Sequence, residues 1–92
     1  MLKPVYTARY KKNFQLLKKR GYNMSKLDEV IDEYLIKQIP LPLDKNDHKL
    51  SGNWEGYREC HIEPDWLLIY RVDKEKVLLY MMRTGTHSDL FR

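Results

Sequence analysis

Three histidines, all in the second half of the chain, are the side chains best suited to chemistry in this sequence. Each stands in a turn-like setting beside polar or aromatic neighbours: His48, His61 and His87. Histidine gives or takes a proton near neutral pH, because its unperturbed pKa is about 6.5. Asp65 follows His61 in the same predicted turn and is placed to orient an imidazole ring. Together these four residues form a set suited to general acid–base catalysis.

Positive charge is concentrated in the first third of the chain. Seven lysine or arginine residues and no acidic residue fall between Arg9 and Lys26, although the net charge of the whole chain is only +4. A concentrated basic surface raises the affinity and the association rate for phosphate backbones. We therefore expect the acid–base residues to act on a polyanion. RNA suits them, because its own 2′-hydroxyl becomes the nucleophile once a base removes the proton.

Length and composition limit the class of protein. The 92 residues are enough for a single domain, 1–92, with one core. Cys60 is the only cysteine, which excludes an intrachain disulfide, and its place among strand residues predicts a small core residue rather than a nucleophile. No apolar stretch approaches the about 18 residues that span a bilayer, and the N-terminus lacks a signal-peptide core. We expect a soluble protein of the cytoplasm.

Two helices are predicted in the N-terminal half, after a short strand at residues 2–6. Thr7 is expected to cap the first helix, which ends at Arg20. One side of this helix carries an apolar stripe: Tyr10, Phe14 and Leu17. The opposite side carries four lysines, either as an ordinary solvated face or as a phosphate-binding surface: Lys11, Lys12, Lys18 and Lys19. A capping-box pattern at Ser25 and Asp28 predicts that the second helix begins near Met24 or Ser25, and it must stop before Pro40.

Strand signals dominate after a long polar loop at residues 43–56, which contains His48. Strands are predicted at residues 57–62, 66–72 and 77–83. The last two are apolar without alternation, which indicates central strands covered on both faces. Helices followed by hairpin-connected strands predict an α+β domain.

Several of these residues have a purely structural alternative. A lone histidine in a turn commonly bonds only to a carbonyl group, so the set as a whole carries the catalytic interpretation. Three histidines and Asp65 are also enough to hold Zn²⁺, but the chain has no compact ligand pair such as CxxC or HExxH, and no metal is expected. Trp54 and Trp66 suit a core or the wall of a site. Phe91 suits either the core or stacking on an RNA base.

Three motifs carry a resemblance to a known family. Residues 47–58 read D-H-x-L-x-G-x-W-x-G-Y-R, residues 61–70 read H-x-E-P-D-W-x-L-I-Y, and residues 83–87 read R-T-G-T-H. In this order, and over nearly the whole chain, they resemble the YafQ-type toxins of the RelE superfamily. Such a toxin cleaves mRNA in the A site of the 70S ribosome without a metal or other cofactor, and a cognate antitoxin neutralises it in a hetero-oligomer.

The resemblance also implies a fold and a set of site residues. The fold is a small antiparallel sheet with two helices packed on one face and a concave site on the other. The implied catalytic residues are His48, His61, Asp65 and His87. The resemblance implies Arg83 as a phosphate contact and Phe91 as an aid to mRNA positioning, and we expect Lys49 and Trp66 to contact RNA as well. The lysines of the first helix would then dock the protein on ribosomal RNA: Lys11, Lys12, Lys18 and Lys19.

Three residues depart from the family pattern. Lys49 stands where proline is expected, and Asp89 and Arg92 stand where small residues are usual. We expect Lys49 to add a phosphate contact and Asp89 to interact with the imidazole of His87. Two other functions stay open from sequence: a non-catalytic RNA- or ribosome-binding protein with structural histidines, and an RNase that acts without the ribosome.

Overall fold

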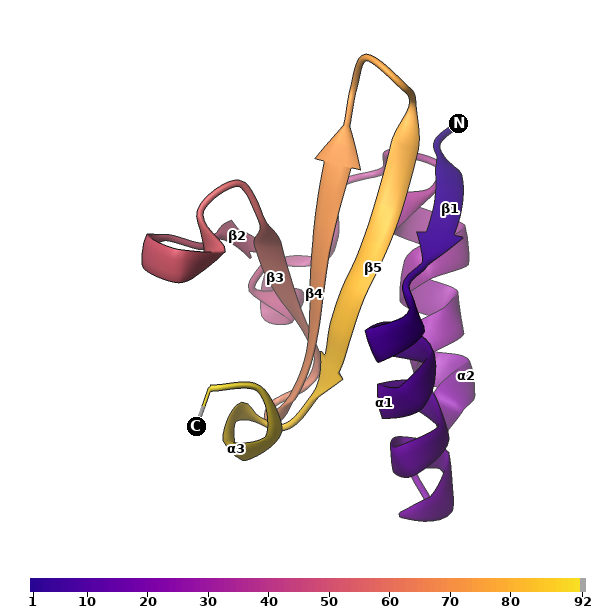
Figure 1. The fold of residues 1–92 in the computed structure, drawn as a ribbon. Coiled ribbons are helices and arrows are strands. Elements are labelled where there is room, and N and C mark those ends of the chain that lie inside the picture. Colours follow the sequence, from indigo (N-terminus) through magenta and orange to yellow (C-terminus); the bar gives the residue numbers. More distant parts are fainter. Residues whose placement is uncertain (92) are drawn as a thin grey trace.

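One mixed sheet organises the molecule (Figure 1). The computed structural model describes residues 1–91, and Arg92 lies outside the described residues. Strand order in the sheet is β1-β5-β4-β3-β2. The strands are β1 (Lys3–Tyr6), β2 (His48–Lys49), β3 (Arg58–Glu63), β4 (Trp66–Asp73) and β5 (Leu78–Gly85). All neighbours are antiparallel except β1 and β5, which are parallel, so the predicted antiparallel sheet gains one parallel edge strand.

Two helices cover one face of the sheet, as predicted. Thr7 caps the first helix, and its Oγ1 accepts a hydrogen bond from the N–H of Tyr10 at 3.2 Å. The second helix is capped by Asn23, whose side chain accepts from the N–H of Ser25 at 3.2 Å. The helix begins at Met24, as predicted, but its cap is Asn23 and not the Ser25 of the capping-box pattern. The helical segments are α1 (Ala8–Lys19), α2 (Met24–Glu29) and a π-helical continuation of α2, Val30–Leu35.

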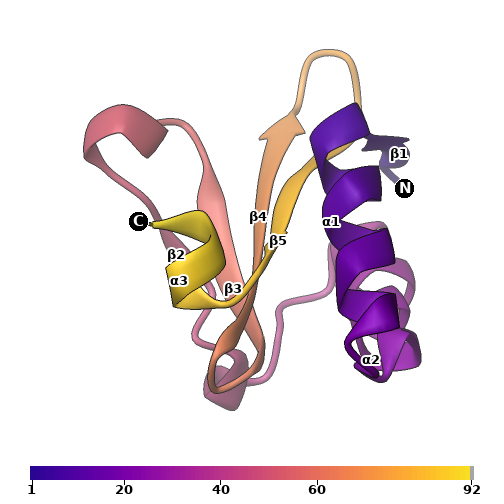
Figure 2. The same cartoon turned by 60° about the horizontal axis from the view of Figure 1, so that its bottom comes forward.

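Strand β4 is buried on both faces, as its unbroken apolar sequence predicted. Trp66, Leu68 and Tyr70 point into the main core beneath α1 and α2. Leu67 and Ile69 point to the opposite face, into a second cluster. That cluster is completed by residues from the loop, β5 and the C-terminal helix: Leu50, Trp54, Tyr57, Met82 and Leu90. Figures 1 and 2 show that this last helix, α3 (His87–Leu90), lies on the other side of the sheet from α1 and α2.

Trp66 is a core residue and not an RNA contact. Its side chain is 1% exposed, and its indole N–H donates a hydrogen bond to Oγ1 of Thr84 at 3.0 Å. The Thr84 hydroxyl in turn donates to the carbonyl of Leu67 at 2.8 Å. A ring enclosed in this way has no surface for a nucleotide, so the prediction of Trp66 as an RNA contact is wrong.

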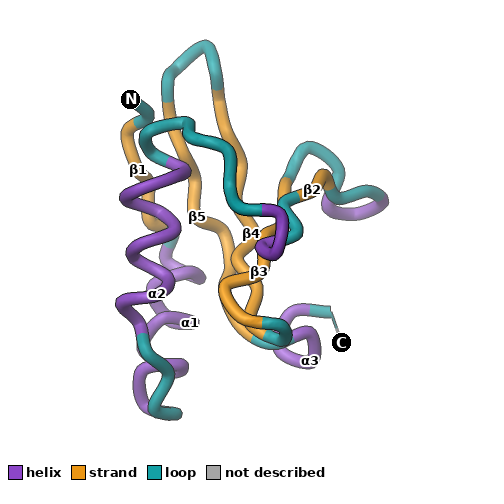
Figure 3. The backbone as a smooth tube through the Cα atoms, turned by 180° about the vertical axis from the view of Figure 1, so that it is seen from behind, coloured by secondary structure: helices purple, strands orange, loops and turns teal. Residues whose placement is uncertain are grey.

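The polar segment at residues 43–56 is ordered rather than a plain loop. Seen from behind, the chain crosses the sheet after the second helix and then turns toward β2 (Figure 3). Short 3₁₀ turns form at Leu43–Lys45 and Gly52–Trp54, and between them β2 pairs His48 with Glu59 of β3. Among the described residues, no helix is both long and apolar enough to cross a membrane.

Candidate active site

The three histidines gather on the face of the sheet opposite α1 and α2. The ring centroids of His61 and His87 are 5.9 Å apart. The Nε2 atoms of His48 and His61 lie 3.6 Å and 3.5 Å from the same carboxylate oxygen, Oε1 of Glu59. Side chains from three separate segments thus meet at one place, as the catalytic interpretation of the sequence requires.

Glu59 is the centre of this group, and sequence analysis missed it. Its side chain is only 7% exposed, so its carboxylate is a nearly buried negative charge between two imidazole rings. Burying such a charge is unfavourable unless cationic or hydrogen-bonding partners surround it. A signal was present: Cys60 and Ile62 are core residues, and strand alternation places Glu59 and His61 together on the other face.

His48 and His61 present the same ring atom to Glu59. Nδ1 of His48 lies 2.7 Å from the carbonyl oxygen of Asn46, and Nδ1 of His61 lies 3.2 Å from that of Pro64. A carbonyl oxygen only accepts, so each Nδ1 donates, and Nε2 is left as the atom that exchanges a proton. Both Nε2 atoms therefore face the Glu59 carboxylate.

The position of His48 is fixed by its neighbour Asp47. The Asp47 carboxylate accepts from Nη2 of Arg58 at 3.2 Å and from the Tyr70 hydroxyl at 2.5 Å. Burial and the Asp47 carboxylate raise the pKa of Tyr70, so its hydroxyl keeps the proton that it donates. These bonds anchor the start of β2 to β3 and β4, which holds His48 against Glu59.

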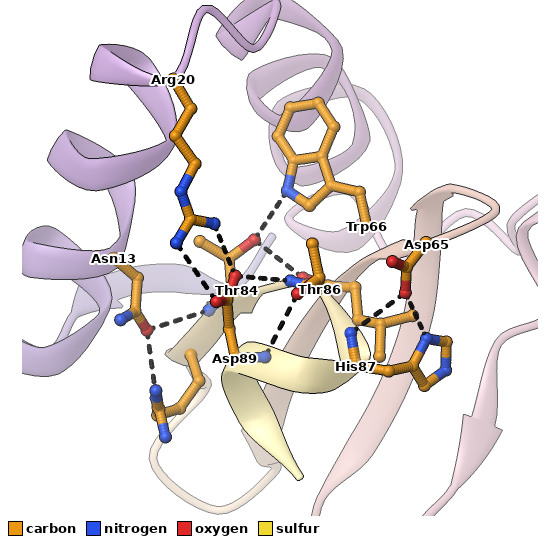
Figure 4. A network of polar contacts seen from close by, with 10 residues as sticks. Asn13, Arg20, Asp65, Trp66, Thr84, Thr86, His87 and Asp89 are labelled. Carbon is orange, nitrogen blue, oxygen red and sulfur yellow. Dashed lines mark hydrogen bonds and ion pairs between the residues drawn. The ribbon is translucent and has the colours of Figure 1, made fainter. Parts of the chain in front are cut away.

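His87 is paired with a different carboxylate, Asp65. Its Nδ1 lies 2.6 Å from Oδ1 of Asp65, and its backbone N–H donates to the same oxygen at 3.1 Å (Figure 4). Two hydrogen bonds lower the pKa of Asp65: chiefly the one from the His87 ring, and next the one from the His87 backbone N–H. Asp65 is therefore ionised at neutral pH. With Nδ1 bound to Asp65, Nε2 of His87 is the nitrogen available to a substrate.

Arg83 lies on the same face of the sheet as Glu59. The register pairs His48 with Glu59, Glu59 with Ile69, and Ile69 with Arg83, which forms one row across four strands. Nε of Arg83 donates to Oδ1 of Asn13 at 3.1 Å. Its two terminal nitrogens have no hydrogen-bond partner within residues 1–91, and they are the part of a guanidinium that binds phosphate in two-pronged fashion.

The other predicted RNA contacts lie around this group. Phe91 is 41% exposed, with its ring 6.4 Å from that of His87 and 6.5 Å from that of Trp54. Lys49 is exposed on β2, next to His48. The lysines of α1 are also exposed, on the side away from the core, and take no part in the histidine group: Lys11, Lys12, Lys18 and Lys19.

Asp89 does not contact the His87 ring, contrary to expectation. Its carboxylate binds Arg20 of α1 and the backbone N–H of Thr86. The imidazole partner of His87 is Asp65 alone among the carboxylates of the described residues.

Three of the site residues have the geometry to hold a metal ion. Glu59, His61 and His87 each offer one ligand atom, and these atoms all lie within 4.8 Å of one another. Two imidazoles and a carboxylate are a donor set that Zn²⁺ and Cu²⁺ accept. Sequence analysis named His61 and His87 among possible Zn²⁺ ligands but expected no metal, and it missed Glu59, because the ligands come from β3 and from the helix that follows β5.

Comparison with known proteins matches the whole chain. The family model described as the bacterial toxin of type II toxin–antitoxin system, YafQ, matches residues 2–92. The mRNA interferase toxin YafQ of Escherichia coli (strain K12) is 43% identical over 86 residues, which cover 94% of this chain and 91% of that protein.

Solved structures agree in fold over the same length. The toxin in the crystal structure of the E. coli DinJ–YafQ complex is 38% identical, with a TM-score of 0.89 and full coverage of both chains. A metal-bound toxin from Helicobacter pylori is 35% identical, with a TM-score of 0.91, over 99% of this chain and 100% of that one. These matches confirm the resemblance seen in the sequence motifs. The chain belongs to the YafQ family of bacterial toxins of type II toxin–antitoxin systems.

Proposed function

We propose that this protein is an endoribonuclease that cuts translated mRNA in the ribosomal A site by metal-independent acid–base catalysis. The observation that carries the proposal is the pairing of His61 and His87, with ring centroids 5.9 Å apart and a different carboxylate beside each imidazole, Glu59 and Asp65. Two imidazoles at this spacing can face the two oxygens of one phosphodiester site that exchange protons: the 2′-oxygen, which loses one, and the departing 5′-oxygen, which gains one. The E. coli relative is itself named an mRNA interferase.

The reaction begins when a base removes the proton of the 2′-hydroxyl. The 2′-oxygen then forms a bond to phosphorus, the bond from phosphorus to the 5′-oxygen breaks, and an acid gives its proton to that departing oxygen. His61 and His87 supply the base and the acid, and His48 shares the Glu59 carboxylate with His61. The guanidinium of Arg83 offsets the extra negative charge on the pentavalent phosphate. Lys49 is a further phosphate contact in this proposal.

The carboxylates have distinct tasks. Oδ1 of Asp65 accepts one hydrogen bond from the His87 ring and one from the His87 backbone N–H, which fixes the ring and sets which nitrogen faces the substrate. Glu59 stabilises whichever of His48 and His61 carries a proton. Phe91, exposed beside His87, is suited to stack on an mRNA base, an interaction worth about 1–3 kcal/mol.

The ribosome contributes orientation in this account. Imidazoles work as acid and base near neutral pH, so the site needs the ribosome chiefly to hold the 2′-oxygen in line with the departing oxygen. The exposed lysines of α1 lie outside the histidine group and dock the toxin on ribosomal RNA through their charge. We place this activity in the bacterial cytoplasm, carried by residues 1–92 as one domain.

The proposed protein partner is a cognate antitoxin. The E. coli toxin was crystallised with DinJ in a toxin–antitoxin complex. By family membership, we propose that an antitoxin encoded beside this chain binds it in a hetero-oligomer and blocks its activity.

Metal binding is a second candidate property, favoured by the Glu59–His61–His87 geometry and by the metal-bound relative from H. pylori. In the proposed mechanism a metal ion at these residues inhibits the reaction, because it occupies the nitrogen lone pairs that exchange protons.

Binding and chemistry should separate by mutation. His61→Gln and His87→Gln should lower the single-turnover cleavage rate on programmed ribosomes by about 10²-fold or more, with ribosome affinity unchanged. Changing both Lys11 and Lys18 to Glu should instead weaken ribosome binding and reduce its salt dependence, with the rate at saturation preserved.

The control for charge changes both Lys74 and Lys76, in the β4–β5 turn, to Glu. This variant should keep the ribosome affinity and the cleavage rate of the wild type. Loss of binding in the histidine variants would assign these residues to docking and favour the non-catalytic alternative. Equal cleavage of free RNA and of mRNA on ribosomes would favour the ribosome-independent RNase.

Glu59→Gln should lower the cleavage rate by about tenfold or more, because a neutral amide cannot stabilise a protonated imidazole as a carboxylate does. Glu75→Gln, in an exposed turn, is the matched control. If both variants cleave at the wild-type rate, Glu59 has no part in the chemistry.

Chelator treatment should leave the toxin active. The protein is exposed briefly to EDTA, transferred to buffer that contains Mg²⁺ alone for the ribosomes, and assayed for cleavage. Full activity is expected, with inhibition when Zn²⁺ or Cu²⁺ is added. Activity that disappears after chelation and returns only with Zn²⁺ would make the protein a metalloenzyme.

A further inference from the structure

Helix α1 reaches the active-site end of the sheet through two residues, Asn13 and Arg20. They are seven positions apart, two helical turns, and therefore lie on the same side of the helix. Figure 4 shows both side chains directed at the end of β5 and at α3. The lysines proposed to dock on the ribosome are on this helix as well.

Asn13 holds the end of β5 at its uncovered edge. Strand β1 pairs with β5 only as far as Met81, so the last residues of β5 have no strand on that side. Oδ1 of Asn13 accepts from the backbone N–H of Thr84 at 3.2 Å and from Nε of Arg83 at 3.1 Å. One amide oxygen therefore completes the sheet edge and fixes the direction of the Arg83 guanidinium.

Arg20 holds α3 through Asp89. Its Nη1 and Nη2 donate to the two carboxylate oxygens of Asp89 at 2.8 Å and 3.3 Å. Asp89 also closes the capping box of α3: its carboxylate accepts from the N–H of Thr86 at 3.0 Å, and its own N–H donates to Oγ1 of Thr86 at 3.2 Å. His87 lies between these two capping residues, so the bonds that fix α3 also fix His87.

Gly85 provides the space that this arrangement needs. A Cβ atom at residue 85 would lie 2.9 Å from Oδ2 of Asp89, closer than real Cβ contacts allow. The carboxylate can fold back over the chain to reach both Arg20 and the N–H of Thr86 only because residue 85 has no side chain.

Arg20 also compensates the charge of Asp89. A carboxylate at this place, two residues from His87, opposes the approach of an RNA phosphate unless a cation neutralises it. The hydrogen bond from Arg20 is the main cause that lowers the pKa of Asp89 to about 2, so the pair is fully ionised at neutral pH. The resemblance placed small residues at this position in the family, so the pair is a departure of this chain.

We infer that Asn13, Arg20 and Asp89 form a clamp through which α1 positions Arg83 and His87 for RNA cleavage. The inference rests on the proposed function. These three are positioning residues: each acts through the side chain that it holds and touches no reacting atom. The clamp couples two tasks of the toxin, because the helix that docks on the ribosome is also the helix that sets the catalytic groups.

The test compares Arg20→Ala, Asp89→Ala and the double variant in single-turnover cleavage at saturating ribosomes. Arg20→Ala should slow cleavage by about tenfold. The change holds α3, and with it His87, less firmly, and it leaves the Asp89 carboxylate unpaired against an approaching phosphate. Asp89→Ala should cost less, about threefold, because it leaves no unpaired carboxylate. The double variant should match Asp89→Ala and thus cleave faster than Arg20→Ala.

The matched control is Lys37→Ala, which breaks an ion pair of similar length, 2.7 Å to Glu33, far from the site. It should cleave at the wild-type rate. Arg20→Lys, which keeps the charge, should recover most of the Arg20→Ala loss. A purely structural role predicts the opposite order, with the double variant slower than either single one.

A measurement on the free toxin separates this inference from the proposed function. Titration of the Asp89 carboxyl by NMR should give a pKa near 2 in the wild type and a clearly higher pKa in Arg20→Ala. Since the folded pKa is depressed, the stabilisation from this pair is complete above the unfolded value of about 3.9 and is lost as pH falls toward 2.

The outcomes are distinct. A wild-type protein that cleaves no RNA overturns the proposed function, and the cleavage role of the clamp with it, whatever the titration shows. A wild type that cleaves, with Arg20→Ala cleaving equally fast, overturns the clamp alone. Loss of ribosome affinity in Arg20→Ala at an unchanged rate assigns Arg20 to docking and also overturns it.

Discussion

The double-sided burial of strand β4 is the constraint on which the rest of the structure depends. Its successive apolar residues cannot leave either face in water, so each face must be covered. Helices α1 and α2 cover one face. On the other face the available cover is smaller, a 3₁₀ turn and the four-residue helix α3. His87 belongs to α3 itself, and His61 lies near it on β3.

The electrostatics of the site follow from this arrangement. Glu59 and Arg83 belong to the strands on either side of β4, and Ile69, which lies between them in the row, is fully buried in the second cluster. A nearly buried carboxylate beside two imidazoles and an arginine in the same row provide both charge signs within one sheet face. In the proposed reaction, proton exchange uses the carboxylate and imidazoles and phosphate binding uses the arginine.

Much of the fold followed from local sequence. The Thr7 cap, the apolar stripe of α1 and the continuous apolar run of β4 each have a periodicity or a capping residue that local physics determines. The three histidines were recognised from sequence as one set by their residue type, but their meeting place depends on the pairing of β2 with β3 and on α3. Strand β2 was not predicted, because two residues are too few to show a pattern.

What the sequence did not reveal depends on tertiary contacts. Glu59 is one acidic residue within a strand, and only the alternation with Cys60 gave its direction. Trp66 stands in a motif that suggests a site residue, yet its hydrogen bond to Thr84 exists only once β4 and β5 pair. The bonds from Asn13 and Arg20 span about 70 positions, beyond the reach of any local pattern.

The chemistry of the cut ends tests the central claim most directly. Wild-type toxin is incubated with ribosomes that carry a translated mRNA, and the termini of both fragments are identified by mass spectrometry and enzymatic end-labelling. Attack by the 2′-oxygen leaves the phosphate on the upstream fragment, so the account predicts a 2′,3′-cyclic or 3′-phosphate there and a 5′-hydroxyl on the downstream fragment. A 5′-phosphate on the downstream fragment would show that water was the nucleophile and would contradict the roles assigned to His61 and His87.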